Sequence, residues 1–404
     1  MKKSIILIIM DGLGDRPSEK FRGRTPLEAS YTPNMNRMAR NGISGLMYSV
    51  DQGMVCGSDT SHLSILGYDP RKVYTGRGPF EAMGLGMEVK PGDIAFRANY
   101  GTRKDHKVID RRAGRIEDST EELSNALSME IEDVKITVKS GVEHRAALVM
   151  HGPGLSEKIT DSDPHQAGEE IRRVEPLEKE ADKTARILNE YLERSRKILD
   201  GAPLNKKRVN EGKLPANELL LRGAGQAPVI PSFEEKYGMK GAYIIGIPMI
   251  KGLAEMIDLK RIEVPEITGG KNTNYTGKLR AARENSSKFD FILMNIKAPD
   301  ATAHDRSPEE KKWVMERIDE AMGNLLGIED DALVILTGDH STSSTTGEHT
   351  GDPVPLILYT SGIRKIPSER FSEGACARTG FTIKSGDLMN YALQITDRLE
   401  KYGA

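Results

Sequence analysis

Cysteine is nearly absent from this chain. Among its 404 residues there are only two, Cys56 and Cys376, which is too few for a disulfide framework or for a metal site built from thiolates. So little cysteine is typical of a protein that works in a reducing interior. We therefore expect a cytoplasmic protein.

Long apolar runs and a dominant sign of charge are missing as well. No apolar stretch approaches the roughly 20 residues that a membrane span needs. The run from Ile5 to Met10 is shorter than the apolar region of a signal peptide, and Asp11 follows it at once. With 58 basic and 60 acidic residues the net charge is −2, which creates no field that gathers nucleic acid or anionic lipid. We expect a small-molecule partner, neither nucleic acid nor membrane, and the pattern predicts no particular oligomeric state.

The sequence has instead a series of short runs rich in Ile, Val and Leu. These runs do not alternate with polar residues, so they predict fully buried parallel strands. Helices separate them: Thr32 and Gly42 bound one, and Ser307, Pro308 and Glu310 supply the N-cap, first-turn proline and capping box of another that runs to about residue 326. This order predicts an α/β fold with a doubly wound, mostly parallel sheet. The predicted strands are 4–10, 242–247, 289–295, 332–337 and 354–359.

The middle of the chain, from about Arg71 to Ala227, has a different character. Charges are denser there, and loops rich in proline and glycine flank the segment as hinges do. A chain of 404 residues also exceeds the usual size of one domain. The segment has weaker strand signals at 93–100, 133–139 and 145–150, and a long charged helix over about 176–199. We predict a catalytic domain of residues 1–72 and 228–404 and a smaller inserted α+β cap of residues 73–227.

Polar residues of metal-binding type follow three of the predicted strands. Ligands bind outside the carboxyl ends of the strands in a doubly wound sheet, so these side chains are expected to converge. A single Asp or His in such a place is most often a helix cap or a loop residue, but six together are hard to explain in that way. The six are Asp11, Asp300, His304, Asp339, His340 and His349.

This mixture of carboxylates and imidazoles suits two divalent metal ions, with Mn, Co, Zn and Mg as candidates. Two ions about 3.5 to 4 Å apart would clamp the attacking and leaving oxygens of an in-line phosphoryl displacement. Asp300 and His304 are four residues apart and can lie on one face of a helical turn. The adjacent Asp339 and His340 point different ways and can serve different ions. The residues therefore predict a two-metal phosphoryl-transfer centre.

A serine precedes the apolar, helix-like stretch that runs to Leu66. Ser58 is thus expected at a helix N-terminus, where the dipole and the backbone amides favour an alkoxide or its phosphate ester. A nearby metal ion would lower its pKa further. Two alternatives stay open from the residues alone: Ser58 only caps the helix, or Thr60 or Ser61 is the reactive hydroxyl.

Several segments together resemble the archaeal-type cofactor-independent phosphoglycerate mutases, a branch of the alkaline phosphatase superfamily. The resemblance covers the whole chain and implies a sheet of alkaline-phosphatase type. It also implies that Ser58 carries the phosphoryl group, that Asp11, Ser58, Asp339 and His340 serve one metal, and that Asp300, His304 and His349 serve the other. The segments are IIMDGLGDRP, GSDTSHLSILGYDP, DIAFRANYGT, DRRAGRI, DSDPH, KAPDATAHD and TGDHSTSSTTGEHTGDPVPLILY.

The resemblance further implies an isomerase of glycolysis and gluconeogenesis. Such an enzyme interconverts 3-phosphoglycerate and 2-phosphoglycerate without a bisphosphoglycerate cofactor, and its inserted domain grips the substrate. Arginine suits carboxylate and phosphate through bidentate contacts, although each arginine could equally be a solvated surface residue. The candidates are Arg97, Arg111, Arg112, Arg145 and Arg222, with Asp163 and His165 for protons or phosphate and Lys278 for the transferring group.

Two other functions fit the same residues. A phosphatase or another phosphomutase could use the same metal core, since the inserted domain would select the acceptor. The identity of the product separates these enzymes from a mutase. A catalytically silent protein could keep the metals for stability, but a structural site has no need of a nucleophile such as Ser58.

Overall fold

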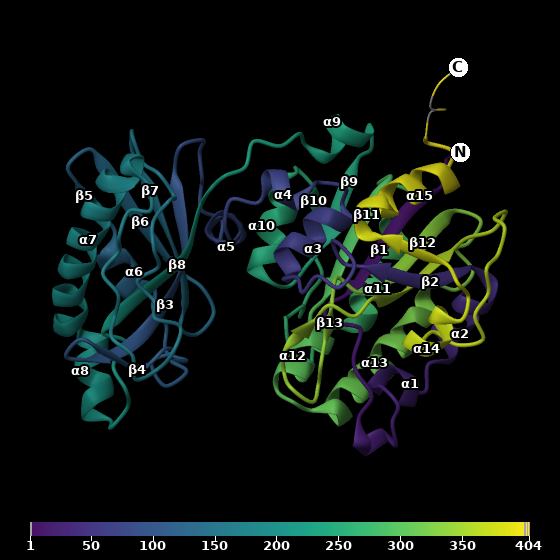
Figure 1. Ribbon diagram of the computed structural model, residues 1–404, viewed down its shortest axis with the longest axis horizontal. Helices are drawn as coiled ribbons and strands as arrows, with labels where there is room; N and C mark the ends of the chain where they lie inside the picture. The colour runs from purple at the N-terminus through teal and green to yellow at the C-terminus, as the bar shows by residue number, and fades with distance from the viewer. Residues whose placement is uncertain (1, 400, 402, 404) are drawn as a thin grey trace. The chain divides into compact units, whose positions relative to one another are not determined.

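The apolar runs come together in one eight-stranded sheet. The computed structural model describes residues 2–399, 401 and 403, and in this part of the chain the strand order is β10-β9-β11-β1-β12-β15-β2-β16 (Figure 1). Neighbours from β10 to β12 are parallel, as are β2 and β16. The predicted α/β class with a mostly parallel sheet is confirmed. The strands are β1 Ser4–Met10, β2 Ile43–Tyr48, β9 Gly241–Ile244, β10 Lys260–Arg261, β11 Phe291–Ile296, β12 Ala332–Thr337, β15 Val354–Tyr359 and β16 Thr382–Lys384.

One strand direction differs from the prediction. β15 runs antiparallel to both of its neighbours, so the expectation of a parallel strand at 354–359 is wrong. All of its residues are buried, and a continuous apolar run reports burial on both faces but not direction. The connection from β12 holds the short strands β13 (Ser341–Thr342) and β14 (His349–Thr350) and no crossover helix. The chain therefore returns antiparallel.

Helices lie on both sides of this sheet (Figure 1). Apolar residues of α2 (Pro33–Asn41), α11 (Tyr275–Asn285) and α13 (Pro308–Met322) share one core cluster with Ile6, Ile8 and Met10 of β1. The alternate residues of β1 are also fully buried, as expected for a strand covered on both faces. The other helices are α1 Pro26–Ala29, α3 Ser58–Ile65, α4 Pro70–Val73, α5 Gly78–Gly84, α6 Glu121–Leu127, α8 Pro203–Asn210, α9 Phe233–Tyr237, α10 Pro248–Met256, α12 Ala298–His304, α14 Glu373–Ala377 and α15 Leu388–Ile395.

Two helix starts differ from the predictions. Ser307 accepts a bond from the Glu310 amide at 3.4 Å, but the Glu310 carboxylate pairs with a neighbouring lysine, so the predicted capping box is only half formed. The long helix α7 (Asp182–Gly201) begins later than the predicted start near Pro176. Pro176 is held in a β-bridge with Ile159, which keeps that segment extended.

The chain separates into two units. The core unit joins Met1–Val73 to Pro231–Ala404, and the inserted unit is Tyr74–Ile230. The inserted unit has its own antiparallel sheet, ordered β4-β3-β7-β6-β5 with β8 also paired to β3, and its own apolar core, which includes α7. Within the described residues, no helix combines the length and the apolar content needed to cross a bilayer. The strands are β3 Ile94–Lys104, β4 Lys107–Asp110, β5 Met129–Ile131, β6 Val134–Ser140, β7 Arg145–His151 and β8 Glu218–Gln226.

Candidate active site

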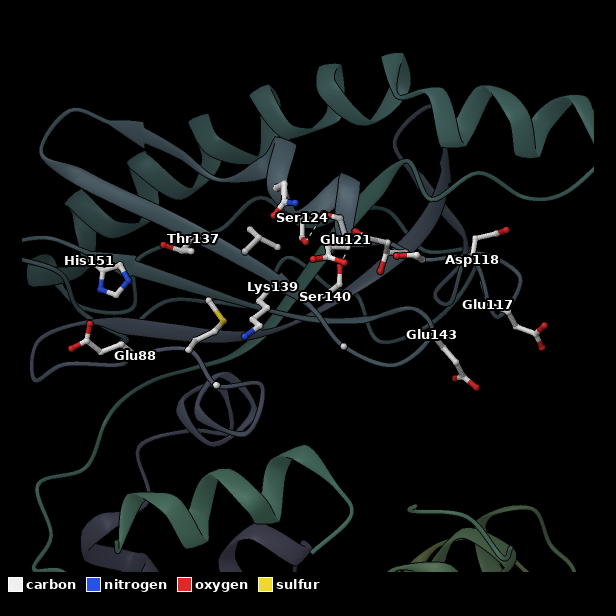
Figure 2. Close-up of a pocket in the computed structure, with 17 residues that line it drawn as sticks. Glu88, Glu117, Asp118, Glu121, Ser124, Thr137, Lys139, Ser140, Glu143 and His151 are labelled. Atoms are coloured by element: carbon white, nitrogen blue, oxygen red, sulfur yellow. Dashed lines mark hydrogen bonds between the residues drawn. The ribbon is translucent and has the colours of Figure 1, made fainter. Parts of the chain in front are cut away.

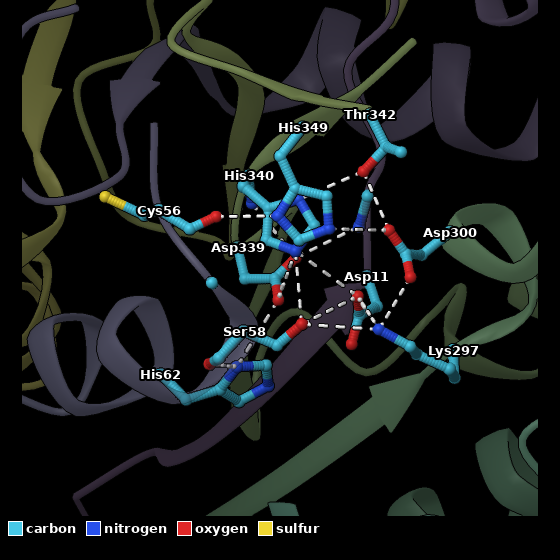
Figure 3. Close-up of polar contacts among 12 residues, drawn as sticks. Asp11, Cys56, Ser58, His62, Lys297, Asp300, Asp339, His340, Thr342 and His349 are labelled. Carbon is cyan, nitrogen blue, oxygen red and sulfur yellow. Dashed lines mark hydrogen bonds and ion pairs between the residues drawn. The ribbon is translucent and has the colours of Figure 1, made fainter. Parts of the chain in front are cut away.

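The register of three strands brings their ends to one place. Met10 of β1 pairs with Ile296 of β11, and Ile9 pairs with Thr337 of β12. The residues that follow these strands therefore start side by side at the carboxyl edge of the sheet, where ligands bind in such folds. Asp11, Lys297 and Asp339 are among them, and Figure 3 shows their side chains converging.

Ser58 and three of the predicted ligands form a buried group in the core unit. The Ser58 hydroxyl donates to Asp11 Oδ1 at 3.2 Å and lies 3.1 Å from His340 Nε2. His340 Nε2 is 3.6 Å from Asp11 Oδ1 and 3.4 Å from Asp339 Oδ2. The Asp11, Asp339 and His340 side chains are fully buried, so the charges among them interact strongly.

Asp300, His304 and His349 form an adjoining group. Asp300 Oδ2 lies 3.2 Å from His304 Nε2, both on α12. His349 Nε2, from β14, is 3.5 Å from Asp300 Oδ1 and 3.3 Å from His304 Nε2. The ring of His340 stacks on that of His349 with centroids 3.8 Å apart. All six predicted ligands are thus together, and two sets among them could hold a metal ion: Asp11, Asp339 and His340, and Asp300, His340 and His349.

The hydrogen bonds of His304 and His349 fix their tautomers. His304 Nδ1 lies 2.7 Å from the Gly347 carbonyl, and His349 Nδ1 lies 2.8 Å from the Cys56 carbonyl. A carbonyl only accepts, so each Nδ1 carries a proton and each ring turns its Nε2 toward Asp300. This is the arrangement of metal-binding imidazoles. The hydrogen bond to Asp300 raises the pKa of His304, so the position facing its Nε2 favours positive charge.

His340 is held in the same way. Thr342 donates its hydroxyl proton to Asp300 at 2.7 Å, so its oxygen accepts from His340 Nδ1 at 3.1 Å. The other nitrogen, Nε2, faces Ser58 and the carboxylates. Asp339 Oδ1 accepts the Gly12 and His340 amides, while the buried Asp339 Oδ2 has no hydrogen-bond partner among the described residues. A buried carboxylate oxygen without a donor is costly unless a cation meets it. The donor set therefore fits a divalent metal ion.

Ser58 is the hydroxyl of its segment that faces this cluster. α3 begins at Ser58, but its N-cap is Gly57, and the Ser58 hydroxyl contacts Asp11 and His340, so the alternative that Ser58 only caps the helix is wrong. Thr60 Oγ1 turns back to the Gly57 carbonyl at 3.1 Å. Ser61 is fully buried. Of the three hydroxyls, that of Ser58 is the one in contact with the carboxylate and imidazole cluster.

Lys297 is a site residue that sequence reasoning missed. Its Nζ lies 2.8 Å from Asp11 Oδ1, 2.7 Å from Asp300 Oδ2 and 3.3 Å from Ser58 Oγ. Burial opposes its charge, but Asp11, Asp300 and Asp339 raise the pKa of Lys297 above its ordinary value. Burial raises the pKa of Asp11, as does Asp339. Burial also acts to raise the pKa of Asp300, but Lys297 and its histidine neighbours bring it well below its usual range. The sequence signal for Lys297 was its place directly after β11.

A second layer lies behind Ser58 and Asp11. His62 Nδ1 donates to the Ser58 carbonyl at 2.7 Å, and its Nε2 accepts from the Asn295 amide at 3.2 Å. Asn295 also donates to Asp11 Oδ2 at 3.0 Å. Lys278 is buried and donates to the Asn295 carbonyl at 2.7 Å, and burial lowers its pKa to about 8. The sequence signal for His62 was its spacing of four residues from Ser58, which puts both on one helix face.

In the inserted unit, several of the predicted substrate residues cluster on the sheet. Arg97 of β3 pairs in register with Arg222 of β8. The fully buried Asp163 accepts from Arg111 Nε and Nη2 at 3.0 and 2.6 Å, and lies 4.0 Å from Arg222 Nε. Burial, together with the nearby Arg77, lowers the pKa of Arg97 to about 9. Glu81 lies 3.8 Å from Arg97 Nη1, so Arg97, Arg111 and Arg222 together face the two carboxylates of Glu81 and Asp163. A group in which arginines outnumber carboxylates is suited to an anionic ligand.

The remaining predicted residues of this unit lie closer to solvent. His165 Nε2 lies 3.1 Å from Asp161 Oδ2, and the His165 amide donates to Asp163 Oδ1 at 2.9 Å. Arg112 and Arg145 are exposed. Arg145 begins β7 and lies near enough to Arg97 to help lower the pKa of that guanidinium.

A pocket of about 700 Å³ in the inserted unit does not involve these arginines (Figure 2). Its lining is mainly acidic and polar, with Lys139 and His151 as the basic side chains. That charge is opposite to the one a phosphorylated acid requires. Its acidic residues are Glu88, Glu117, Asp118, Glu121 and Glu143.

A serine hydroxyl among carboxylates and imidazoles at the carboxyl edge of a mostly parallel sheet defines an α/β protein with a candidate metal-dependent phosphoryl-transfer centre. The family model described as 2,3-bisphosphoglycerate-independent phosphoglycerate mutase matches residues 39–205. A Picrophilus torridus protein of that name is 52% identical over 402 residues, which cover 100% of both chains. A Methanocaldococcus jannaschii protein named as a mutase of the same kind is 45% identical over 413 residues, which cover 100% of both chains. The chain belongs to this family, and the resemblance found in its motifs is confirmed.

Solved structures agree with this assignment. The cofactor-independent phosphoglycerate mutase of Thermoplasma acidophilum aligns with a TM-score of 0.74 at 45% identity, covering 98% of this chain and 100% of that one. A Pyrococcus horikoshii protein aligns with a TM-score of 0.88 at 33% identity, with 100% of both chains covered.

Proposed function

We propose that the protein interconverts 3-phosphoglycerate and 2-phosphoglycerate without a bisphosphoglycerate cofactor. The observation that carries this proposal is the Ser58 hydroxyl, 3.2 Å from Asp11 and 3.1 Å from His340 within a carboxylate and imidazole cluster. Full-length relatives at 45–52% identity named for this activity support it. The proposed place of the reaction is glycolysis and gluconeogenesis in the cytoplasm.

The proposed metal sites use the residues that converge at the sheet edge. Asp11, Ser58, Asp339 and His340 would hold one ion, and Asp300, His304 and His349 the other. Two divalent ions, Mn, Co, Zn or Mg, would stabilise charge on the transferring phosphoryl group when bound. The convergence of the three histidine Nε2 atoms on the carboxylates, and the Asp339 Oδ2 that has no hydrogen-bond partner among the described residues, support this assignment.

In the proposed reaction Ser58 Oγ attacks the phosphorus of the substrate. A bond forms between Oγ and phosphorus, and the bond between phosphorus and the glycerate oxygen breaks with its electron pair on that oxygen. The proton lost from Ser58 is matched by the one that the glycerate oxygen gains. The glycerate then reorients, and its other hydroxyl takes the phosphoryl group back from the phosphoserine. Charge stabilisation on the transferring group supplies most of the rate in such chemistry.

The arginines of the inserted unit are the groups proposed to bind the glycerate carboxylate or the phosphate. Asp163 would act through Arg111, because its two hydrogen bonds set the plane of that guanidinium. Arg97 and Arg222 pair in register across β3 and β8. Their guanidinium groups are two further candidates for bidentate contacts with the substrate. The inserted unit would thus be the substrate-binding cap.

One assay tests the proposed function. The purified protein is stripped of metal with a chelator, supplied with Mn²⁺ and 3-phosphoglycerate, and assayed for 2-phosphoglycerate and free phosphate together. We expect 2-phosphoglycerate with little phosphate, and no turnover before Mn²⁺ is added. Phosphate without 2-phosphoglycerate would identify a phosphatase. Absence of both products in the metal-loaded protein would identify a catalytically silent one.

A further inference from the structure

We propose that Lys297 is a further catalytic residue, whose ammonium group binds the phosphoryl group during its transfer to and from Ser58. The inference rests on the proposed function. Its geometric basis is that Nζ lies 3.3 Å from the nucleophilic oxygen and, at the same time, 2.8 Å from Asp11 Oδ1 and 2.7 Å from Asp300 Oδ2 (Figure 3). The ammonium group thus joins the nucleophile to both proposed metal groups.

The fold determines this position. β11 ends at Ile296, which pairs with Met10, so the next residues of the two strands, Lys297 and Asp11, begin at the same level of the sheet edge. The Lys297 carbonyl accepts the Ala301 amide in the first turn of α12. Asp300 lies three residues further along the chain, on the same side of that turn. The end of β11 and the first turn of α12 therefore fix the backbone of Lys297. The carboxylates of Asp11 and Asp300 fix its Nζ atom.

Lys297 is more exposed to solvent than Asp11 and Asp300, the two carboxylates that it contacts. The side chain of Lys297 is 23% exposed, whereas the side chains of Asp11 and Asp300 are 0% exposed. The Lys297 side chain is therefore partly open to solvent, while its two carboxylate partners are enclosed. A lysine ammonium has three donors, so it can keep its carboxylate contacts and still donate to a phosphoryl oxygen.

The charge of the cluster favours the same role. Asp11, Asp300 and Asp339 bring three negative charges to Lys297, and two divalent ions would bring four positive ones. With the lysine, the sum leaves two positive charges, which match a transferring phosphoryl group of roughly two negative charges. Without the lysine, one positive charge would face that group. Preorganised positive charge of this kind acts strongly in a site with little water.

The group transfer itself leaves Lys297 chemically unchanged. Ser58 Oγ gains its bond to phosphorus as the glycerate oxygen loses its own, and the proton balance closes between these two oxygens. Lys297 keeps its protons throughout and donates hydrogen bonds to a non-bridging phosphoryl oxygen. The competing explanation is that Lys297 is only a counter-ion for Asp11 and Asp300. That explanation predicts altered metal affinity but parental phosphoryl transfer once metal is saturating.

The test uses two neutral variants, Lys297→Met and Lys297→Gln, with Lys312→Met as the matched control. Lys312 lies in the same unit in an i,i+4 pair with Glu316. Calorimetry with Mn²⁺ gives metal stoichiometry and affinity, and thermal unfolding reports the fold. Rapid mixing of each Mn²⁺-saturated protein with 3-phosphoglycerate, followed by mass spectrometry, gives the rate of phosphoserine formation on Ser58.

We expect both neutral variants to bind the parental number of Mn²⁺ ions but to form phosphoserine about 100- to 1,000-fold more slowly, while Lys312→Met keeps the parental rate. A parental rate in either folded neutral variant, or a defect that more Mn²⁺ restores, would overturn the assignment in favour of the counter-ion. If the parental protein itself forms no phosphoserine, the proposed function fails instead. The two failures are therefore distinguishable.

Discussion

At the scale of single residues, the site is organised by hydrogen bonds that decide which atoms are free. Backbone carbonyls accept hydrogen bonds from Nδ1 of His304 and of His349. The Thr342 hydroxyl oxygen accepts one from Nδ1 of His340. Each Nε2 then faces a carboxylate of the cluster. The two carbonyls and the hydroxyl are uncharged. The position of the proton on each ring is therefore set by the backbone near the histidines and by the Thr342 side chain.

The first prediction at this scale concerns the nucleophile. Ser58→Ala should abolish mutase activity while leaving the unfolding midpoint and the metal content nearly unchanged, because the hydroxyl would supply only part of one metal shell. Activity and metal content are measured on the same sample. Ser61→Ala is the control and should stay active, since Ser61 is fully buried. Comparable turnover in Ser58→Ala would move the nucleophile elsewhere.

A second prediction concerns a carboxyl group outside the cluster. Glu373 accepts from the Asp15 amide at 3.2 Å and from Thr25 Oγ1 at 2.8 Å, and burial raises its pKa from 4.5 to about 7. Between those values the folded state holds more protons than the unfolded state. The contribution of Glu373 to the free energy of unfolding is therefore largest below pH 4.5 and is lost as pH rises to 7.

Glu373→Gln should remove this loss. The free energy of unfolding of the variant, relative to the parental protein, should rise between pH 5 and pH 8 by up to about 3 kcal/mol, and by less to the extent that solvent reaches the partly exposed carboxyl. Urea unfolding at several pH values measures it. Glu309→Gln, at an exposed pair with Lys20, should not reproduce the rise. Parallel profiles for Glu373→Gln and the parental protein would contradict the pKa shift.

Residue types explain which site members could be predicted. Asp and His beside strand ends stand out because they are common metal ligands, and all six such residues do converge. Lys297 does not stand out, since most lysines are solvated. Its contact with Ser58 depends on the pairing of β1 with β11. Asn295 likewise becomes meaningful only when β11 meets β1 and the helix that carries His62.

At the scale of elements, the pairing of three parallel strands matters most. β1, β11 and β12 end within one residue of each other in register, and each then turns into a different loop. Continuous apolar runs predicted these strands, because burial on both faces leaves that pattern. The direction of β15 could not be predicted in the same way, since an antiparallel strand in the middle of the sheet is equally buried.

A prediction at this scale concerns the turn after β1. Gly12 has φ +65°, and a Cβ there would lie 2.7 Å from the Asp300 Cβ. Gly12→Ala should therefore lower Mn²⁺ affinity by at least about 10-fold, beyond the backbone cost of about 1 kcal/mol for a left-handed alanine. Calorimetry and urea unfolding measure the two effects.

Gly327→Ala is the matched control for this variant. Gly327 has φ +80°, and a Cβ there would meet nothing within 4 Å. Its substitution should show the backbone cost alone and parental Mn²⁺ affinity. Equal Mn²⁺ affinity in the two variants would mean that the loop after β1 can move away from Asp300 without disturbing the metal ligands.

At the scale of the whole molecule, phosphoryl chemistry and substrate binding are proposed to belong to different units. The core unit contains Ser58 and the carboxylate and imidazole cluster, and the inserted unit contains the arginine cluster around Asp163. Each unit has its own apolar core. In the proposed reaction, loss of the hold on glycerate would leave water as an acceptor for the phosphoryl group. The inserted unit is therefore the part that should decide between isomerisation and hydrolysis.

That division leads to a prediction about products. In the proposed reaction, the glycerate must stay near the phosphoserine after transfer to Ser58, and water must stay away. Weakening the hold on glycerate should lower 2-phosphoglycerate formation and raise phosphate release per turnover. We expect this shift for substitutions in the set Arg97, Arg111, Arg145, Asp163 and His165. Asp163→Asn is the most informative, because it keeps the shape of the side chain but weakens its two bonds to Arg111.

The measurement is the ratio of 2-phosphoglycerate to phosphate for each variant at saturating Mn²⁺, with Ser58→Ala as the blank. Arg186→Ala is the control within the same unit, because Arg186 forms an exposed ion pair with Glu132 and should keep the parental ratio. A uniform fall in both products would indicate weaker substrate binding without loss of water exclusion. Parental ratios and rates in all five variants would mean that the inserted unit does not hold the glycerate, and a phosphatase would then be the better description of the core chemistry.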